Sequence, residues 1–434
     1  MSAKTGSPGR LLALDVFRGL TIGGMIVVNN QFGDHAYTAL RHAGWNGWTL
    51  ADLVFPFFVF IMGVALAFSL SNRSKSGQPA SRLYGHTLYR AILLFALGLI
   101  SYYDPAKWPE HMRIMGVLQR LAVVYLFASL ITMNSGKRGL VCWTVGLLAG
   151  YWILMKYVAV PGFGAGDLSR AGNLAGYIDN IILKGHMHTE VWEPEGILST
   201  IPSIASCLIG VLVGNVIKSE KSLAEKLTPI LVAGNVLIVL AFIANNWFPI
   251  NKNLWSPSFV LLTAGIGSCL LAVLIWVIDY KSFKWWTGPF FVLGRNPLFA
   301  YLISGLLMSS LTWFSVSQLG GTCDNHKTLE GCPAYQGCVW DQSRNKCITP
   351  GVNCKLFRME SICGNISDCS WNSETKKCVN PHEGKVTLKN WIAQNLFFSW
   401  AGFRNGSLFF TLAYVMLWMG ITGIMYRFKI IIKL

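Results

Sequence analysis

Long apolar stretches recur along almost the whole chain, and this pattern restricts the fold more than any single motif. They lie at about 11–30, 50–71, 87–103, 114–133, 139–157, 196–217, 227–245, 257–279, 288–312 and 406–426. A helix needs about 20 apolar residues to cross a bilayer. Charged residues make up only 13% of the chain, whereas soluble domains have about 25%. The sequence therefore predicts an all-α polytopic membrane protein with about ten transmembrane helices.

Lys and Arg residues are distributed unequally between the two ends of these expected helices. One side carries most of them, including Arg10, Arg73, Lys137, Arg138, Lys218 and Arg427. The short loops of the other side hold Arg41, Lys107, Arg113, Arg170, Lys184 and Lys252. Because cytosolic loops are richer in Lys and Arg, both termini are expected in the cytosol, and the first apolar stretch is expected to be a retained signal-anchor. The net charge of +16 is not gathered into one stripe, which argues against a nucleic-acid partner.

Most of the cysteines belong to a tandem repeat. The spacing C-x8-C-x5-C-x8-C recurs after 31 residues, with the members Cys323, Cys332, Cys338, Cys347, Cys354, Cys363, Cys369 and Cys378. Zinc sites usually contain C-x2–4-C steps, so disulfides are favoured and a zinc pair is the alternative. Disulfides need an oxidising compartment, which puts the repeat on the side opposite the termini. Asn365 begins a glycosylation sequon there.

These patterns predict three regions. Residues 1–312 form a transmembrane core of about nine helices. Residues 321–381 form a small disulfide-rich lumenal insertion, and residues 385–434 form an interfacial helix and a last transmembrane helix that completes the core. The interfacial helix corresponds to the amphipathic stretch near Trp391–Trp400.

Three arginines fall inside expected helices, where a charge is costly and therefore informative. Arg18 follows Asp15 by three residues, while Arg120 and Arg295 interrupt apolar runs. A vestibule lined by these arginines suits a polyanion such as a nucleotide phosphate, because guanidinium pairs bidentately with phosphate. Structural ion pairs, such as Asp15 with Arg18, are the alternative.

A second group of polar residues lies where helices meet the lumenal side. His42 precedes Asp52, which enters the second apolar stretch, and Asn29 ends the first. Histidine exchanges a proton near neutral pH, so next to a carboxylate His42 is a candidate for catalysis, with an ordinary surface histidine as the alternative. Three acids precede the sixth stretch, where they either bind a cationic group or merely favour the helix start: Glu190, Glu193 and Glu195.

Five blocks of the sequence together resemble one family. They are LDVFRGL (14–20), HAGWNGWTLADLVFPFFVFIMG (42–63), RIMGVLQRLAVVY (113–125), HTEVWEPEGILSTI (188–201) and NKNLWSPSFV (251–260). In this order they look like the heparan-alpha-glucosaminide N-acetyltransferases, lysosomal membrane enzymes that use cytosolic acetyl-CoA to acetylate terminal glucosamine in the lumen. The cysteine repeat is not part of the usual pattern of that family.

The resemblance implies a role for each candidate residue. His42 matches the active-site histidine of the family, Asn29 matches an asparagine near it, and Asp52 or Asn29 is expected to orient the imidazole. Acetyl-CoA is the implied co-substrate, without a metal, and it is expected to be bound by Arg18, Arg120 and Arg295. The amino sugar is expected to be bound by Trp45, Asn46, Glu190 and Glu195. A lysosomal or related endomembrane location, a role in glycosaminoglycan degradation and a homodimer are further expectations.

The mechanism and the class of function stay open at this point. His42 either takes the acetyl group as acetyl-imidazole or deprotonates the sugar ammonium in a ternary complex. A polytopic transporter of an acylated sugar or organic anion is the alternative function, although no internal repeat pairs the two halves of the chain. A third hypothesis is an adhesion or receptor protein, in which the cysteine modules bind the partner and the helices only anchor them in the membrane.

Overall fold

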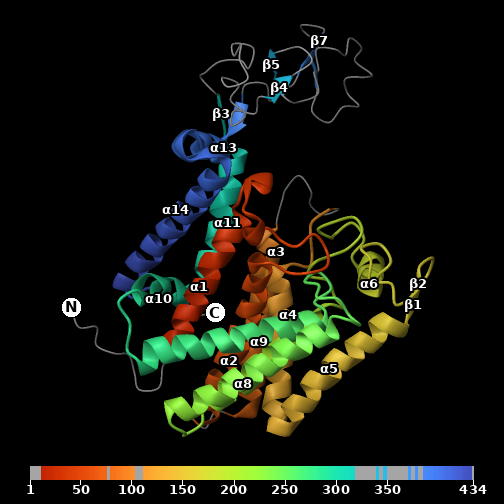
Figure 1. The fold of residues 1–434 in the computed structure, drawn as a ribbon, viewed down its shortest axis with the longest axis vertical. Coiled ribbons are helices and arrows are strands. Elements are labelled where there is room, and N and C mark those ends of the chain that lie inside the picture. The colour runs from red at the N-terminus through yellow and green to blue at the C-terminus, as the bar shows by residue number, and fades with distance from the viewer. Residues whose placement is uncertain are drawn as a thin grey trace. The chain divides into compact units, whose positions relative to one another are not determined.

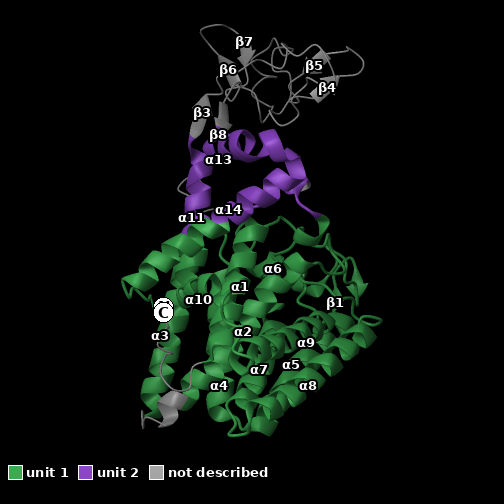
Figure 2. Ribbon diagram, turned by 60° about the vertical axis from the view of Figure 1, so that its left-hand side comes forward, with its two compact units in different colours: residues 1–29, 38–302, 415–434 green, residues 30–37, 303–414 purple. Residues whose placement is uncertain are grey.

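The computed structural model describes two compact units, which Figure 2 colours separately. The described residues are 11–75, 79–102, 111–317, 339–341, 346–348, 370–372, 377–379 and 385–432. Unit 1 comprises residues 1–29, 38–302 and 415–434, and unit 2 comprises residues 30–37 and 303–414.

Unit 1 is built almost entirely of helices, most of which Figure 1 labels, while Figure 2 labels α7. They are α1 (Leu12–Asn29), α2 (Leu50–Lys75), α3 (Ala80–Ser101), α4 (Val117–Asn134), α5 (Lys137–Tyr157), α6 (Leu174–Ile182), α7 (Thr200–Ile217), α8 (Leu223–Ala244), α9 (Pro257–Leu274) and α10 (Thr287–Arg295). A π-helical stretch, η3 (Ile275–Tyr280), continues α9, and the hairpin of β1 (Ala159–Val160) and β2 (Gly164–Ala165) follows α5. Nine helices of the described chain are long and apolar enough to cross a membrane, or ten if a bent pair counts as one span. The predicted all-α polytopic fold is confirmed.

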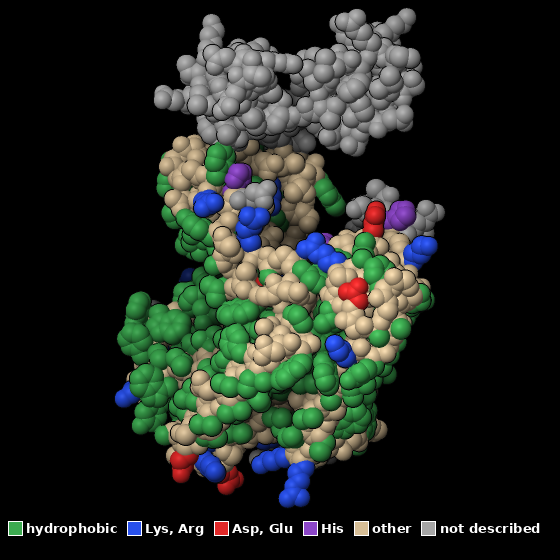
Figure 3. Space-filling model, turned by 45° about the vertical axis from the view of Figure 1, so that its right-hand side comes forward, with side chains coloured by type: hydrophobic (Ala, Val, Ile, Leu, Met, Phe, Trp, Pro, Cys, Tyr) green, Lys and Arg blue, Asp and Glu red, His purple; other side chains and the backbone are tan. Residues whose placement is uncertain are grey.

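Apolar side chains cover much of the outer surface of this bundle. Figure 3 shows one face, on which hydrophobic side chains occupy a broad band and charged side chains gather below it. Exposed hydrophobic residues are frequent on α5 and α8, for example Val145, Ile153, Val232, Val239 and Phe242. Water-soluble monomers rarely expose such extended apolar surface, whereas lipid tails accept it.

The predicted span at 288–312 is two helices in the structure. Helix α10 ends at Arg295, α11 (Pro297–Trp313) begins two residues later, and the two are bent by 85°. Proline has no N–H for the helical hydrogen-bond ladder and disfavours a helical residue before it, so Asn296 leaves the helix. The Asn296 side chain then donates to the Ile430 carbonyl at 3.0 Å and accepts from the Ile432 amide at 2.9 Å.

Helices α2 and α7 touch backbone to backbone in the core of unit 1. A Cβ on Gly63 would lie 1.9 Å from the carbonyl oxygen of Cys207, and one on Gly214 would lie 2.8 Å from the Cβ of Ala67. Small residues allow such close approach between membrane helices. The contacting pairs advance together along both helices, so α2 and α7 are parallel and their N-terminal ends lie at the same end of the unit.

The two ends of unit 1 are joined by one long helix. Helix α9 and η3 together have 24 residues, which corresponds to a length of about 36 Å. At the C-terminal end of η3, Asp279 accepts hydrogen bonds from the amides of Leu12 and Ala13 at 3.3 and 3.1 Å. The start of α1 therefore lies at this end, and the loop that precedes Pro257 lies at the other.

Unit 2 contains the rest of α11 and the helices α13 (Leu388–Ala393), η7 (Gln394–Phe398) and most of α14 (Ser399–Arg427). Gly402 interrupts α14 with a φ of 72°, a left-handed conformation that glycine adopts without strain. This kink separates the stretch predicted to be interfacial from the last predicted span. Strands β3 (Ser315–Ser317) and β8 (Lys385–Thr387) pair antiparallel on either side of the cysteine repeat.

The cysteine repeat contains two hairpins of the same register. They are β4 (Val339–Asp341) with β5 (Lys346–Ile348), and β6 (Ser370–Asn372) with β7 (Lys377–Val379). Trp340 pairs with Cys347, and Trp371 pairs with Cys378. The sequence period of 31 residues is thus also a period of the described backbone. The side chains of the eight cysteines, and Asn365, lie outside the described residues, so the disulfides and the glycan stay predictions.

Candidate active site

His42 and Asp52 form a hydrogen-bonded pair at the start of α2. Asp52 lies in the first turn of this helix and its side chain is 1% exposed, whereas the His42 side chain, in the preceding loop, is 48% exposed. Nδ1 of His42 lies 2.7 Å from Oδ1 of Asp52. A carboxylate only accepts hydrogen bonds, so Nδ1 carries the hydrogen and the lone pair of Nε2 is left for a substrate.

The carboxylate of Asp52 is held in place by the backbone around it. Its Oδ2 accepts from the amides of Ala43 and Thr49 at 3.0 and 3.1 Å. Thr49 directly precedes α2, where a helix start leaves amides without intrahelical partners. The same contacts that begin α2 therefore direct Oδ1 of Asp52 toward His42.

Lys252, in the loop between α8 and α9, brings a positive charge to this pair. Its Nζ lies 3.4 Å from Oδ1 of Asp52, 3.1 Å from Nδ1 of His42 and 3.5 Å from Nε2 of His42. Burial lowers the pKa of Lys252 below its usual value, against the opposing charges of Asp52 and Glu195. The arrangement is a largely buried cation beside the imidazole on which the chemistry would occur.

The loop that carries Lys252 is tied to the loop that carries His42. Asn251, which is fully buried, donates from Nδ2 to Oδ1 of Asn46 at 3.1 Å, and the amide of Gly47 donates to the Ile250 carbonyl at 2.7 Å. Trp255 is also fully buried and has a φ of 48°, which is strained for a residue with a Cβ. The predicted substrate ligand Asn46 thus contacts the loop that positions Lys252.

Trp45 lies in a wall of aromatic and cationic side chains. Its indole N–H donates to the Leu168 carbonyl at 2.9 Å, and its ring meets that of Trp192 edge-on at 5.3 Å between centroids. The guanidinium of Arg170 lies over the Trp45 ring, 5.6 Å from its centroid. An apolar ring face beside polar groups is a surface on which a sugar ring can rest.

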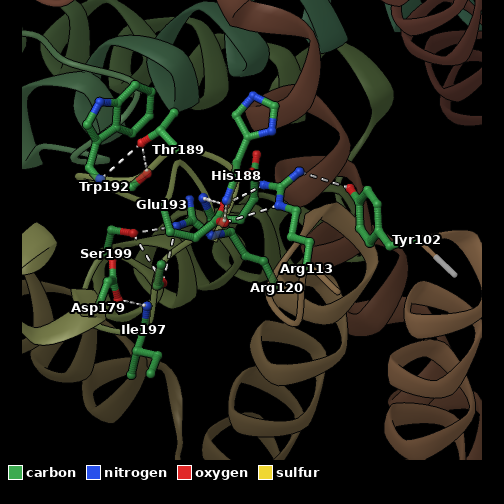
Figure 4. A network of polar contacts seen from close by, with 12 residues as sticks. Tyr102, Arg113, Arg120, Asp179, His188, Thr189, Trp192, Glu193, Ile197 and Ser199 are labelled. Carbon is green, nitrogen blue, oxygen red and sulfur yellow. Dashed lines mark hydrogen bonds and ion pairs between the residues drawn. The ribbon is translucent and has the colours of Figure 1, made fainter. Parts of the chain in front are cut away.

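Arg113 is the centre of a buried charge network before α4 and α7, which Figure 4 shows. It donates two parallel hydrogen bonds to Glu193 and one of 2.6 Å to Glu195, and its Nη1 lies 3.3 Å from the Tyr102 hydroxyl. Burial opposes the charge of Arg113, but the hydrogen bonds to Glu193 and the charge of Glu195 raise its pKa above the usual value. Burial likewise opposes ionisation of Glu195, yet Arg113 and Arg120 hold the pKa of Glu195 below its usual range. The predicted sugar ligand Glu195 is therefore already paired with an arginine.

Arg120 and Asp179 extend this network into the protein. Arg120 is fully buried, donates to the Ser199 hydroxyl and to the Gly196 carbonyl at 3.3 Å, and lies over the Trp255 ring at 4.9 Å. Its Nε and Nη1 have no hydrogen-bond partner among the described residues. Burial raises the pKa of Asp179 to about 7, although the Ile197 amide donates to it at 2.9 Å.

Comparison with known proteins identifies the family. The sequence profile described as "Heparan-alpha-glucosaminide N-acetyltransferase, catalytic" matches residues 10–250, which is more than half of the chain. The chain belongs to this family. It is 34% identical to the mouse heparan-alpha-glucosaminide N-acetyltransferase over 354 residues, which cover 68% of this chain and 53% of the relative. The human protein of the same name is also 34% identical, over 353 residues that cover 68% of this chain and 52% of the relative. The chain thus spans about half the length of these relatives.

The other predicted site residues of this heparan-alpha-glucosaminide N-acetyltransferase family member do not all lie together. Arg18 pairs with Asp15 at 3.1 Å and donates to the Gly294 carbonyl at 3.3 Å, and the neighbouring Arg295 lies over the Phe291 ring. Arg18 and Arg295 therefore lie at the end of unit 1 at which α1 starts, whereas Arg120 lies in the network beside Lys252.

Asn29 and Glu190 are exposed, and within the described chain no hydrogen bond joins either of them to His42.

Sequence reasoning missed three residues of this site. Lys252 and Arg113 were placed among the loop cations of the lumenal side, and Asp179 was not singled out. The only sequence signal for the first two was their position inside blocks shared with the family, NKNLWSPSFV and RIMGVLQRLAVVY. Their partners are far away in the chain, 200 positions in the case of Lys252 and Asp52, so no local spacing could reveal the contact.

Proposed function

We propose that this protein is a transmembrane N-acetyltransferase. It moves the acetyl group of cytosolic acetyl-CoA to the amino group of a terminal glucosamine-type sugar on the lumenal side. The family supports this function, and the single observation that carries it is the His42–Asp52 hydrogen bond of 2.7 Å at the end of the unit opposite the start of α1. A fixed imidazole with an available nitrogen is what acyl transfer to an amine needs.

In the first possible route, Nε2 of His42 removes a proton from the sugar amine as its nitrogen attacks the thioester carbon. The C–S bond then breaks, and the CoA sulfur takes the proton from the imidazolium. In the second route Nε2 attacks the carbon itself and the C–S bond breaks, so the CoA thiolate leaves and takes a proton from the sugar ammonium. The resulting amine then attacks the acetyl-imidazolium and displaces the imidazole, which takes the proton that the amine nitrogen releases. Asp52 serves both routes, because it keeps the hydrogen on Nδ1 and stabilises the imidazolium.

The two ends of unit 1 suit the two substrates. Arg18 and Arg295 provide cations for the CoA phosphates at the end of unit 1 at which α1 starts. From Arg18 to Asn29 helix α1 rises about 17 Å, a distance that an extended thioester arm has to bridge. Trp45, with Trp192 and Asn46, provides a surface for the sugar ring beside His42, and exposed Glu190 provides a counter-charge for its ammonium.

The test uses the full-length chain in proteoliposomes with glucosamine enclosed and acetyl-CoA added outside. We expect CoA thiol outside and N-acetylglucosamine inside in equal amounts, both detected by mass spectrometry. The variant His42→Ala should abolish both products, whereas His111→Ala, at an exposed histidine outside the site, should retain them. Full product formation by a folded His42→Ala protein would contradict the proposal.

A transporter of an acylated sugar or organic anion is the second candidate function. It is favoured by the α10–α11 pair, because transporters often bind their substrates at helices that are broken within the membrane. A transporter would leave acetyl-CoA intact. Uptake of labelled substrate without CoA thiol above the protein-free blank would therefore favour this function over acetyl transfer.

A further inference from the structure

The Lys252 ammonium contacts the face of the His42 ring. Its Nζ is nearly equidistant from the two ring nitrogens, at 3.1 Å from Nδ1 and 3.5 Å from Nε2. In the plane of the ring, such a position would bring Nζ into steric overlap with a ring carbon. The ammonium therefore lies out of the ring plane, next to the space in which Nε2 would meet a substrate.

The hydrogen bonds of Lys252 are incomplete among the described residues. An ammonium has three hydrogens to donate. Oδ1 of Asp52 is one acceptor, at 3.4 Å, and Nε2 of His42 lies at 3.5 Å, whereas Nδ1 of His42 cannot accept because its own hydrogen points to Asp52. In the described part of the chain, at least one N–H group of Lys252 thus has no protein acceptor and remains for a ligand.

Stabilisation of Asp52 does not explain why the lysine is there. The Asp52 carboxylate already accepts from His42, from the Ala43 amide and from the Thr49 amide, all at shorter distances than from Lys252. The Lys252 side chain is only 18% exposed, and burying an ammonium costs free energy that one long ion pair does not recover. A largely buried cation in this situation is typical of a group that stabilises charge formed during a reaction.

We propose that Lys252 is a catalytic residue that binds the carbonyl oxygen of the acetyl group as this carbon is attacked. This inference rests on the proposed acetyltransferase function. When the nucleophile adds, the carbonyl π electrons move to oxygen, and Lys252 donates a hydrogen bond to the resulting oxyanion. When the C–S bond breaks, the carbonyl re-forms, and the sulfur takes the proton that His42 removed from the amine or, in the covalent route, a proton of the sugar ammonium. Lys252 keeps its own protons throughout.

The test compares Lys252→Ala and Lys252→Met with the wild type, with N-acetylglucosamine as the measured product. Met keeps the aliphatic stem and removes the charge, so it is the variant least expected to disturb the fold. We expect kcat to fall about 10²–10³-fold in both, with the KM for glucosamine nearly unchanged. Lys184→Ala, at an exposed lysine outside the site, is the matched control and should keep the wild-type kcat.

Chemical rescue separates a catalytic charge from a structural one. Ethylammonium should restore part of the kcat of Lys252→Ala, which leaves room for it, but not that of Lys252→Met or His42→Ala. Measuring the sugar product keeps acetylation of the added amine from being counted.

Three results would overturn the assignment: a kcat of Lys252→Met within about twofold of the wild type, a loss in Lys252→Ala that no cation rescues, or acetylation of Lys252 itself after incubation with acetyl-CoA alone. If the proposed function were wrong, the wild type itself would form no product.

Discussion

Replacing Asp52 by Asn tests the orientation of the imidazole with the smallest change of shape. Oδ2 of Asp52 accepts two backbone amides, from Ala43 and Thr49, so the amide oxygen of an asparagine would take that place. Its NH₂ group would then face Nδ1 of His42 and Nζ of Lys252. Because NH₂ only donates, Nδ1 would have to accept, and the hydrogen of the neutral imidazole would move to Nε2.

The expected loss of activity is large and the expected loss of stability is moderate. A histidine held in the wrong tautomer by the same Asp-to-Asn change loses about 10⁴ in kcat in a serine protease. We expect a loss of about 10²–10⁴-fold here, because the half-exposed His42 can rotate partly out of this contact. Asn keeps the two backbone hydrogen bonds, so the free energy of unfolding should fall by only about 1–3 kcal/mol.

The assay measures kcat and KM for glucosamine, and thermal unfolding in the same detergent. Asp52→Glu, which keeps the charge but lengthens the side chain, should retain more activity than Asp52→Asn. Glu220→Gln, at an exposed acid outside the site, is the control for loss of one negative charge. A folded Asp52→Asn protein with more than half of the wild-type kcat would refute the role of the pair.

Three further changes test the network and the core. Arg113→Met leaves Glu193 and Glu195 buried without their partner, so the free energy of unfolding should fall by about 3–5 kcal/mol, and an unchanged melting temperature would contradict this. The raised pKa of Asp179 means that its ionisation costs the folded state up to about 4 kcal/mol above pH 7 and nothing below about pH 4. Asp179→Asn should therefore raise the melting temperature more at pH 8 than at pH 5, and equal shifts would count against a titrating Asp179. Gly210→Ala would put a Cβ 2.1 Å from the Phe60 carbonyl oxygen and should destabilise by at least 1–3 kcal/mol, whereas Gly146→Ala, in open space, should not.

The sequence predicts the helices well because each one depends on local composition. Nine described helices match the apolar stretches, and the exception has a local cause, since Pro297 breaks the stretch at 288–312. The pairing of His42 with Asp52 could also be anticipated, because only ten positions separate them and the start of α2 brings them together.

Contacts between distant segments could not be predicted in the same way. Arg113 meets Glu193 across 80 positions, and a guanidinium in a loop has no sequence feature that identifies its partner. The sequence groups three arginines that interrupt apolar runs, namely Arg18, Arg120 and Arg295. The apolar pattern does not show, however, at which end of the bundle each of them lies. Depth along the helix axis is a property of the assembled bundle.

The site depends on the core through the parallel pair of α2 and α7. Asp52 lies in the first turn of α2, and Glu195 lies just before α7, so the relative height of these helices sets how the His42 pair and the Arg113 network meet Lys252. Backbone contact at Gly63 and Gly210 fixes the relative height of α2 and α7, because no flexible side chain lies between the two helices at these positions. A methyl group at Gly210 is therefore expected to lower the catalytic rate as well as the stability of the fold. The kcat of Gly210→Ala should fall even at temperatures where the protein stays folded.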